Sequence, residues 1–218
     1  MELIIRRIVN TLFIANTFLI TDPGTRDTII IDPGSNHEKI IQAIEENNLR
    51  PIAILATHGH IDHVIGTHPI KEKYKIPFYI HPADVQFLTP EAHTFLEPYM
   101  DTWKITIPKP DKHLTEGPLE IGSIKLEVIH TPGHTPGGVS IYTGDKLFTG
   151  DTIFRLSIGR TDFGGNIEEL INSIHNKIFK LSKNTIIYPG HGEETTVEHE
   201  IQHNPYMGIN GLYPYKPE

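Results

Sequence analysis

The chain contains no cysteine among its 218 residues. It therefore has no disulfide, no thiolate metal ligand and no cysteine nucleophile. This absence leaves the cellular compartment open, because oxidising and reducing compartments both hold cysteine-free proteins.

Long apolar runs are also missing. No run approaches the roughly 20 residues that a helix needs to cross a bilayer. The N-terminus does not look like an export signal, because it opens with Met1-Glu2 and residues 8–20 are interrupted by polar side chains without a small-residue cleavage site. We therefore expect a cytoplasmic protein with no membrane partner.

An excess of positive charge is the third absence. The formal net charge is −8, which argues against a nucleic-acid partner. A composition that is 38% hydrophobic and 21% charged is ordinary for a folded protein, and we expect a single domain spanning 1–218. The aromatic-rich segment 206–215 could pack on its own domain or on a neighbour, so a homo-oligomer stays open.

Histidine is abundant, with 14 residues, and three histidines fall with an aspartate in the stretch 57–63. The side chains are His58, His60, Asp62 and His63. Imidazole and carboxylate are ligands of zinc and iron. The apolar run 52–56 before them is typical of a buried strand, so the ligands begin where a strand ends. A polar loop with chance histidines is the alternative, and the recurrence of similar pieces argues against it.

Three further ligand-type residues follow later in the chain, each after a short apolar segment and within a glycine-containing turn. They are His134, Asp151 and His191, after the segments 125–129, 146–148 and 185–188. Glycine and proline fix tight turns at these places. This pattern is typical of strands that deliver ligands to one edge of a sheet.

Together these pieces resemble the metallo-β-lactamase superfamily and, within it, the glyoxalase II-like hydrolases. The resemblance runs from the strand and turn at 29–34 to the segment 189–192. It implies two divalent metal ions, with zinc as the first candidate and iron or manganese also open. The implied ligands are His58, His60 and His134 for one metal, Asp62, His63 and His191 for the other, and Asp151 as the bridge between them.

The resemblance also implies the fold, an α+β four-layer αββα sandwich, whereas periodicity alone predicts only a mixture of strands and helices. The expected strands are 3–9, 12–20, 28–31, 77–80 and four within 119–149. The expected helices are 37–48, 67–74, 82–88, 166–181 and 194–203. We expect the chain to lack the C-terminal helical domain that holds glutathione in longer relatives.

The implied reaction is hydrolysis of a thioester such as S-lactoylglutathione by a hydroxide that bridges the metals. Asp62 is the candidate catalytic residue, since it can bind a metal and orient the hydroxide. A thiolate leaves with little need of a proton, and no dedicated general acid is evident, which favours a thioester over an amide. Arg160 is the candidate substrate-binding residue, and an ion pair with Asp162 is its alternative role.

Three other functions stay open. A β-lactamase is one of them, and the segment around Arg160 and the closing loop argue against it, because both fit the thioesterase-like group better. A mononuclear iron oxygenase resembling persulfide dioxygenases would use His58, His134 and Asp151, and those relatives share the stretch 159–163. The loop 189–193 favours the hydrolase instead. A metal-binding module without catalysis is the third possibility, which the complete ligand set argues against.

Supporting residues are also expected. Thr57, Asp32 and Thr152 are candidates for hydrogen bonds that position the ligand loops, with a plain turn role as the alternative for Asp32. The segment 95–103 is a candidate aromatic lid, although core packing or a surface loop is favoured for most of it. The remaining histidines show no common spacing and are expected at the surface or in the core. They are His37, His68, His81, His93, His113, His130, His175, His199 and His203.

Overall fold

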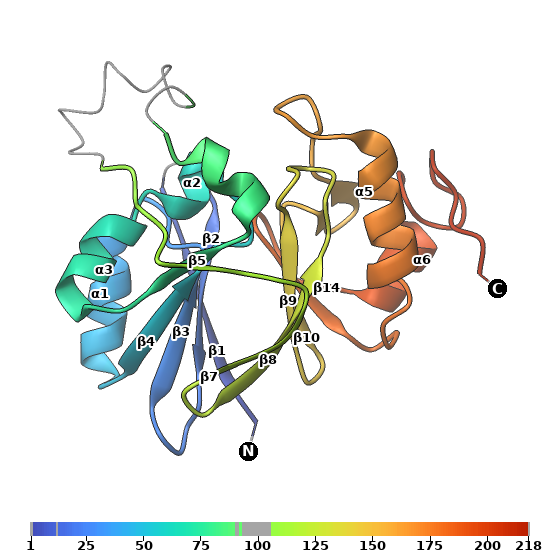
Figure 1. Ribbon diagram of the computed structural model, residues 1–218. Coiled ribbons are helices and arrows are strands. Elements are labelled where there is room, and N and C mark those ends of the chain that lie inside the picture. Colours follow the sequence, from blue (N-terminus) through green and yellow to red (C-terminus); the bar gives the residue numbers. More distant parts are fainter. Residues whose placement is uncertain (1, 12, 90–91, 93–105, 218) are drawn as a thin grey trace. The chain divides into compact units, whose positions relative to one another are not determined.

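A computed structural model describes residues 2–11, 13–89, 92 and 106–217 of the chain (Figure 1). The chain forms two compact units. The first unit comprises Met1–Leu114 with Glu120–Lys125, and the second comprises Thr115–Leu119 with Leu126–Glu218. The expected single domain over 1–218 stays a prediction, and the candidate lid at 95–103 lies outside the described residues.

The first unit is built on a six-stranded sheet with its strands in sequence order. The strands are β1 (Ile4–Val9), β2 (Asn16–Thr21), β3 (Asp27–Ile31), β4 (Arg50–Leu55), β5 (Phe78–Ile80) and β6 (Lys112–His113). Strands β1 to β3 are antiparallel, and β3 to β6 are parallel. The carboxyl ends of β3 and β4 therefore lie at the same edge of the sheet.

Helices cover this sheet through apolar side chains spaced by helical turns. They are α1 (His37–Glu46), the short α2 (Ile61–Val64), α3 (Thr67–Tyr74) and the 3-10 helix η1 (Pro82–Phe87). Ile40 and Ile44 of α1 are one turn apart and fully or almost fully buried, in one core with Ile54 of β4 and Ile70 of α3. In Figure 1, α1 and α3 lie together beside β4.

A second six-stranded sheet has the order β14-β13-β10-β9-β8-β7 and belongs to the second unit except for residues 120–121 of β7 and 124–125 of β8. Its strands are β7 (Gly117–Ile121), β8 (Ile124–His130), β9 (Val139–Thr143), β10 (Lys146–Gly150), β13 (Ile186–Pro189) and β14 (Thr195–Thr196). Strands β10 and β13 are parallel, whereas the pairs β8–β9, β9–β10 and β13–β14 are antiparallel. The short strands β11 (Ile153–Phe154) and β12 (Ser157–Ile158) form a separate hairpin between β10 and the next helix.

The helices of the second unit are α5 (Ile167–Ser173), the π-helical turn η3 (Ile174–Ile178) and α6 (Val197–His203). Leu170, Ile174 and Ile178 are fully buried in one core with Leu147 and Ile187 of the sheet. Each unit therefore supplies one sheet with helices packed on it. No helix in the described ranges is both long and apolar enough to cross a membrane.

Several expected boundaries move for identifiable reasons. The second strand begins at Asn16 rather than Leu12, because Phe13 and Ile14 have positive φ angles of 55° and 58°, which break an extended strand. The last helix begins at Val197 rather than Glu194, because Thr195 and Thr196 pair with β13. The helix expected over 166–181 is shorter and changes to π geometry at Ile174.

Candidate metal centre

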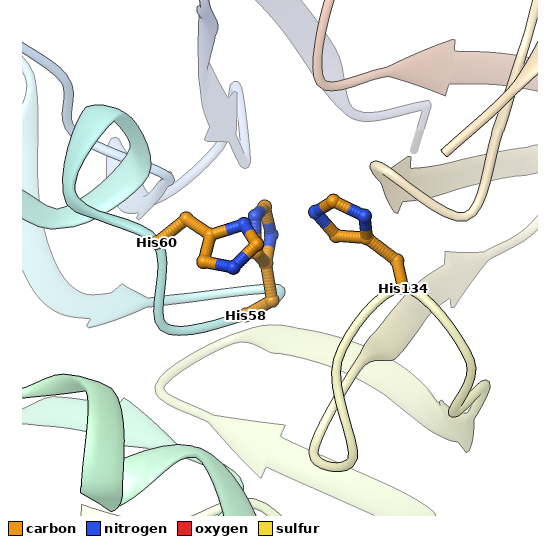
Figure 2. A group of neighbouring side chains, drawn as sticks. All are labelled: His58, His60 and His134. Carbon is orange, nitrogen blue, oxygen red and sulfur yellow. The ribbon is translucent and has the colours of Figure 1, made fainter. Parts of the chain in front are cut away.

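The N-terminal ligand set consists of His58, His60, Asp62 and His63, all in the first unit. Strand β4 ends at Leu55, the loop after it carries the first two histidines, and α2 carries the aspartate and the third histidine. Figure 2 shows the rings of His58 and His60 next to each other on this loop, and their centres are 4.8 Å apart. The rings of His58 and His63 are closer still, at 4.3 Å between centres.

One buried carboxylate, Asp32, orients two of these imidazoles. Its Oδ2 accepts a hydrogen bond from Nδ1 of His63 at 3.0 Å and one from Oγ1 of Thr57 at 2.6 Å. Its Oδ1 accepts from the backbone N–H of Thr57 at 2.7 Å. Thr57 Oγ1 donates to Asp32, so it accepts from Nδ1 of His58, which lies 3.1 Å away. In this chain of hydrogen bonds the Nε2 atoms of His58 and His63 are the ones that would bind a metal ion, since outer partners of ligand histidines fix the tautomer in this way.

The expected support by Asp32 and Thr57 is therefore present as hydrogen bonds. The structure also permits a different ligand set, because ligand atoms of Asp32, His58 and His63 lie within 4.8 Å of one another. Both oxygens of Asp32 are already engaged by hydrogen-bond donors in the same unit. We therefore assign Asp32 to orienting the ligands rather than to binding the ion.

The second pair in the N-terminal ligand set is Asp62 and His63. Oδ2 of Asp62 lies 3.6 Å from Nε2 of His63. Two ligands that each bind one ion at about 2.0–2.2 Å are separated by a distance of this order. The side chain of Asp62 is 16% exposed, whereas that of His63 is fully buried, so the carboxylate is the member that reaches solvent.

Helix η1 supports the loop of His58 and His60. The carboxylate of Asp84, which is fully buried, accepts a hydrogen bond from the backbone N–H of Gly59 at 2.9 Å. Phe87 packs edge-on against the ring of His60, with 5.3 Å between centres. A Cβ atom at Gly59 would come within 2.8 Å of the Asp84 carbonyl and 2.9 Å of Phe87 Cβ. The role of Asp84 could not be predicted from the sequence, because it lies 25 residues from its partner and belongs to no motif.

The C-terminal ligand set consists of His134, Asp151 and His191, all in the second unit. Strands β10 and β13 are parallel, and Gly150 is paired with Pro189 at a register shift, so Asp151 and His191 follow two adjacent strand ends. Oδ2 of Asp151 lies 3.4 Å from Nε2 of His191 and 3.6 Å from Nε2 of His134. One carboxylate oxygen is thus close to both imidazoles. The bridging role of Asp151 stays a prediction.

His134 lies on the loop after β8, labelled in Figure 2. Its Nδ1 donates to the backbone carbonyl of Arg160 at 2.6 Å, which leaves Nε2 as the ligand atom. Thr152, next to Asp151, lies with its hydroxyl 3.2 Å from that of Thr131 at the start of the His134 loop. The expected positioning role of Thr152 therefore has a structural partner.

The side chain of Arg160 takes the alternative role considered above, an ion pair. Its guanidinium donates to both carboxylate oxygens of Asp162, at 2.6 and 2.5 Å, and stands 4.2 Å from the centre of the Phe163 ring. Hydrogen bonding to Arg160 lowers the pKa of Asp162 to about 2. The backbone of Arg160, and not its guanidinium, contacts a ligand of the C-terminal set. Substrate binding by Arg160 stays a prediction.

Gly159 is a second residue whose role appears only in the structure. A Cβ atom there would overlap the carbonyl oxygen of Asp151 and lie 3.1 Å from Nδ1 of His134. Only glycine lets the chain pass this close to two ligands. Gly159 belongs to the stretch 159–163, in which the sequence indicated a role for the arginine and not for the glycine.

The donor atoms of both sets are imidazole nitrogens and carboxylate oxygens, which suit zinc, iron and manganese. Three of the five histidines have an Nδ1 partner within the same unit: His58, His63 and His134. In each of these rings Nε2 is the nitrogen that would bind an ion, as at metal sites where an outer partner fixes the tautomer. The residues present therefore fit divalent metal ions.

The chain is similar in sequence to a known family and to several of its members. Residues 10–191 match the metallo-beta-lactamase superfamily. The chain is 42% identical over 195 residues to the probable metallo-hydrolase YqgX of Bacillus subtilis, covering 87% of this chain and 90% of that protein. It is 38% identical over 206 residues to the hydroxyacylglutathione hydrolase GloC of Haemophilus influenzae, covering 90% and 94% respectively.

Several solved structures are also similar to this chain over most of its length. The B3 metallo-beta-lactamase BLEG-1 is 37% identical with a TM-score of 0.86, covering 94% of this chain and 99% of that one. ETHE1 from Myxococcus xanthus is 26% identical with a TM-score of 0.79, covering 94% and 84%. TTHA1623 in a di-iron-bound form is 33% identical with a TM-score of 0.78, covering 92% and 98%.

The chain belongs to the metallo-β-lactamase superfamily. The expected α+β metallo-β-lactamase fold is confirmed. Among the relatives are metal-dependent hydrolases, and the clustered histidines and aspartates support divalent metal ions as cofactors.

Proposed function

We propose that the chain is a binuclear metal-dependent hydrolase of a thioester, of the hydroxyacylglutathione hydrolase kind. The observation that carries the proposal is the orientation of the ligands within each unit: His58 and His63 through Asp32, and His134 through the carbonyl of Arg160. The similarity to GloC supports the thioester as the substrate class. Zinc is our first candidate for both ions, and the di-iron form of TTHA1623 keeps iron open.

We assign the ligands as the resemblance implies. His58, His60 and His134 bind one ion, Asp62, His63 and His191 bind the other, and Asp151 bridges them. Two bound divalent ions supply hydroxide near neutral pH and polarise a carbonyl group. The chain's own residues hold the imidazole nitrogens in place and keep the bridging carboxylate between His134 and His191.

Asp62 has the catalytic role in this proposal. Its carboxylate is partly exposed and lies beside His63. One of its oxygens can therefore bind the metal ion while the other accepts a hydrogen bond from a water molecule. Hydrolysis forms a carbon–oxygen bond to the acyl carbon and breaks the carbon–sulfur bond, giving a carboxylic acid and a thiol. A thiolate is a good leaving group, which fits a site whose assigned residues include no separate general acid.

The test is free-thiol release from S-lactoylglutathione by the metal-loaded protein, together with metal content. The wild-type protein should hold two ions per chain and release thiol, and a chelator should abolish release. Asp151→Ala should lose metal and activity together. If Asp151→Ala retained two ions and full activity, the bridging assignment would be wrong.

The second candidate is a mononuclear iron oxygenase that acts on a persulfide, using His58, His134 and Asp151. The observation in its favour is that the stretch 159–163 holds His134 through a backbone carbonyl, together with the likeness to ETHE1. Oxygen consumption with glutathione persulfide by the iron-loaded protein, without thiol release from the thioester, would favour this candidate.

β-Lactam hydrolysis is a third possibility, raised by the similarity to BLEG-1. A chromogenic cephalosporin assayed beside the thioester at equal metal loading separates the two. We place the thioester first because the segment around Arg160 and the loop 189–193 resemble the glyoxalase II-like hydrolases, a class that the similarity to GloC supports. A cytoplasmic location, the absence of nucleic-acid and membrane partners, and a homo-oligomer stay predictions.

A further inference from the structure

Helix α6 carries a second group of metal-ligand side chains, outside both ligand sets. Its sequence 199–203 is His-Glu-Ile-Gln-His. Two histidines four residues apart lie on one face of a helix. The pattern His-Glu-x-x-His on a helix holds zinc in metalloproteases, where the glutamate acts as the general base. From the sequence both histidines were expected to be ordinary surface or core residues. Their spacing of four residues matters because the structure places both in a helix.

The glutamate of this pattern is a structural residue here. Glu200 is fully buried, and its carboxylate accepts four hydrogen bonds. The donors are Thr195 Oγ1 at 2.6 Å, His199 Nδ1 at 2.8 Å, Asn204 Nδ2 at 2.7 Å and the backbone N–H of Leu156 at 2.9 Å. A carboxylate so enclosed cannot reach a substrate, so this helix is not a protease site.

The same contact prepares His199 to bind a metal. Because Glu200 accepts a hydrogen bond from Nδ1–H of His199, the lone pair of the neutral imidazole is on Nε2. A carboxylate behind a ligand histidine is the usual arrangement at zinc sites, where it fixes the tautomer and raises the basicity of the imidazole. His199 is about one-third exposed and His203 is exposed, so both rings reach solvent.

The separation of the two rings fits one ion. Two imidazoles on a tetrahedral ion, with metal–nitrogen bonds of about 2.1 Å, have ring centres roughly 5.2 Å apart. The ring centres of His199 and His203 are 5.1 Å apart and the planes are tilted by 55°. The separation of the two ring centres is therefore the one that a shared ion requires.

We propose that His199 and His203 form a peripheral binding site for a borderline divalent ion such as Ni²⁺, Cu²⁺ or Zn²⁺, with Glu200 as the positioning residue behind His199. The remaining coordination positions face water, so the ion exchanges readily and is distinct from the ions of the proposed catalytic centre. The site belongs to the second unit alone and does not depend on the proposed hydrolase function. Glu200 also binds the N–H of Leu156, which joins this site to the β11–β12 hairpin that follows Asp151.

The test uses the zinc-loaded protein and Ni²⁺ alone as the probe. Paramagnetic Ni²⁺ broadens the imidazole NMR signals of the histidines it binds. We expect the signals of His199 and His203 to broaden first and to saturate at one Ni²⁺ per chain. His203→Ala should weaken this binding on the order of 100-fold, because chelation by two linked groups is lost. His113→Ala, at an exposed histidine of the first unit, should leave it unchanged.

Two further variants make the test specific. Glu200→Gln should weaken Ni²⁺ binding by about tenfold, as loss of an outer carboxylate does. His199→Asn should weaken it as strongly as His203→Ala, and circular dichroism verifies that each variant is folded. Thioester hydrolysis should be unaffected by His203→Ala. Equal broadening of His113 and the α6 pair, or unchanged Ni²⁺ affinity in folded His203→Ala, would overturn the proposal.

Discussion

At the scale of single residues, Asp32 is the side chain on which the N-terminal ligand set most depends. It contacts no substrate, yet it accepts hydrogen bonds from His63 and from Thr57, which in turn holds His58. Asp32→Asn keeps its size and tolerates its positive φ of 51°. Because the amide is a poorer acceptor, we expect metal affinity to fall by about 10–100-fold, measured by competition with a chromogenic chelator.

The matched control is Asp145→Asn, at an exposed carboxylate paired with Lys146. It should leave metal affinity within error of the wild type. Equal metal affinity in Asp32→Asn and wild-type protein would remove Asp32 from the support of the site and favour its alternative role as a turn residue.

A second prediction at this scale concerns Arg160 and Asp162. The hydrogen bond from Arg160 holds the pKa of Asp162 at about 2, below the ordinary value of 3.8. The carboxylate therefore stays ionised as pH falls from neutrality, and the pair is lost only as pH approaches about 2. An NMR titration of the Asp162 carboxyl carbon checks this, and a midpoint near 3.8 would show that the pair does not form in solution.

The same pair bears on substrate binding. If Arg160 binds the thioester, Arg160→Ala should raise KM with little change in kcat, because it removes binding common to ground and transition states. Asp162→Asn should lower KM, since it frees the guanidinium. Unchanged KM in both variants would assign Arg160 to the ion pair alone.

At the scale of elements, the segment that follows the β11–β12 hairpin fixes the C-terminal ligand set. Gly159 brings this segment against Asp151, and the next carbonyl accepts from His134. Gly159→Ala places a methyl group on the Asp151 carbonyl, so the segment must move. We expect at least a tenfold loss of metal affinity, on the order of the loss caused by removing an outer partner of a ligand, measured by chelator competition.

Gly144→Ala serves as the control for this change. Gly144 also has a positive φ, 61°, but a Cβ atom there meets nothing within 4 Å. Its substitution should cost about 1–2 kcal/mol of unfolding free energy from backbone strain alone, with metal affinity unchanged. A parallel loss of affinity in Gly144→Ala would mean that general destabilisation, and not the close approach at Gly159, weakens the site.

Element boundaries show what local sequence could not predict. Residues 67–74 form a helix as predicted. This helix could be predicted because the pattern of polar and apolar residues lies within the segment itself. Thr195 and Thr196 became a strand instead of the first turn of α6 because they pair with β13. The hairpin of β11 and β12 was missed because each strand has only two residues, too few to show alternation.

At the scale of the whole molecule, bound metal should contribute to stability. A ligand that binds only the folded state adds about 2.7 kcal/mol when its concentration is 100 times its dissociation constant. We expect chelation to lower Tm and re-addition of Zn²⁺ to restore it, measured by calorimetry at several free-metal concentrations. His203→Ala should leave most of this effect in place, because the proposed catalytic ligands are elsewhere.

The outcome also tests the ligand assignment. If the proposed centre takes ligands from both units, metal should raise the unfolding temperature of both, and Asp151→Ala should abolish the shift. Proteolysis or hydrogen exchange can measure the unfolding of each unit separately. If metal raised the unfolding temperature of one unit only, this would contradict the shared centre and indicate two separate ligand sets.

The family and the ligand-type residues could be predicted from residue types at short spacings, as in the stretch 57–63, and the α+β fold followed from the resemblance that these residues carry. How those residues are held could not be predicted in this way. Asp32 meets His63 across 31 residues, Gly59 meets Asp84 across 25, and the Arg160 carbonyl meets His134 across 26. Such contacts depend on which strand ends lie side by side, and strand pairing is fixed by the burial of the whole core rather than by local pattern.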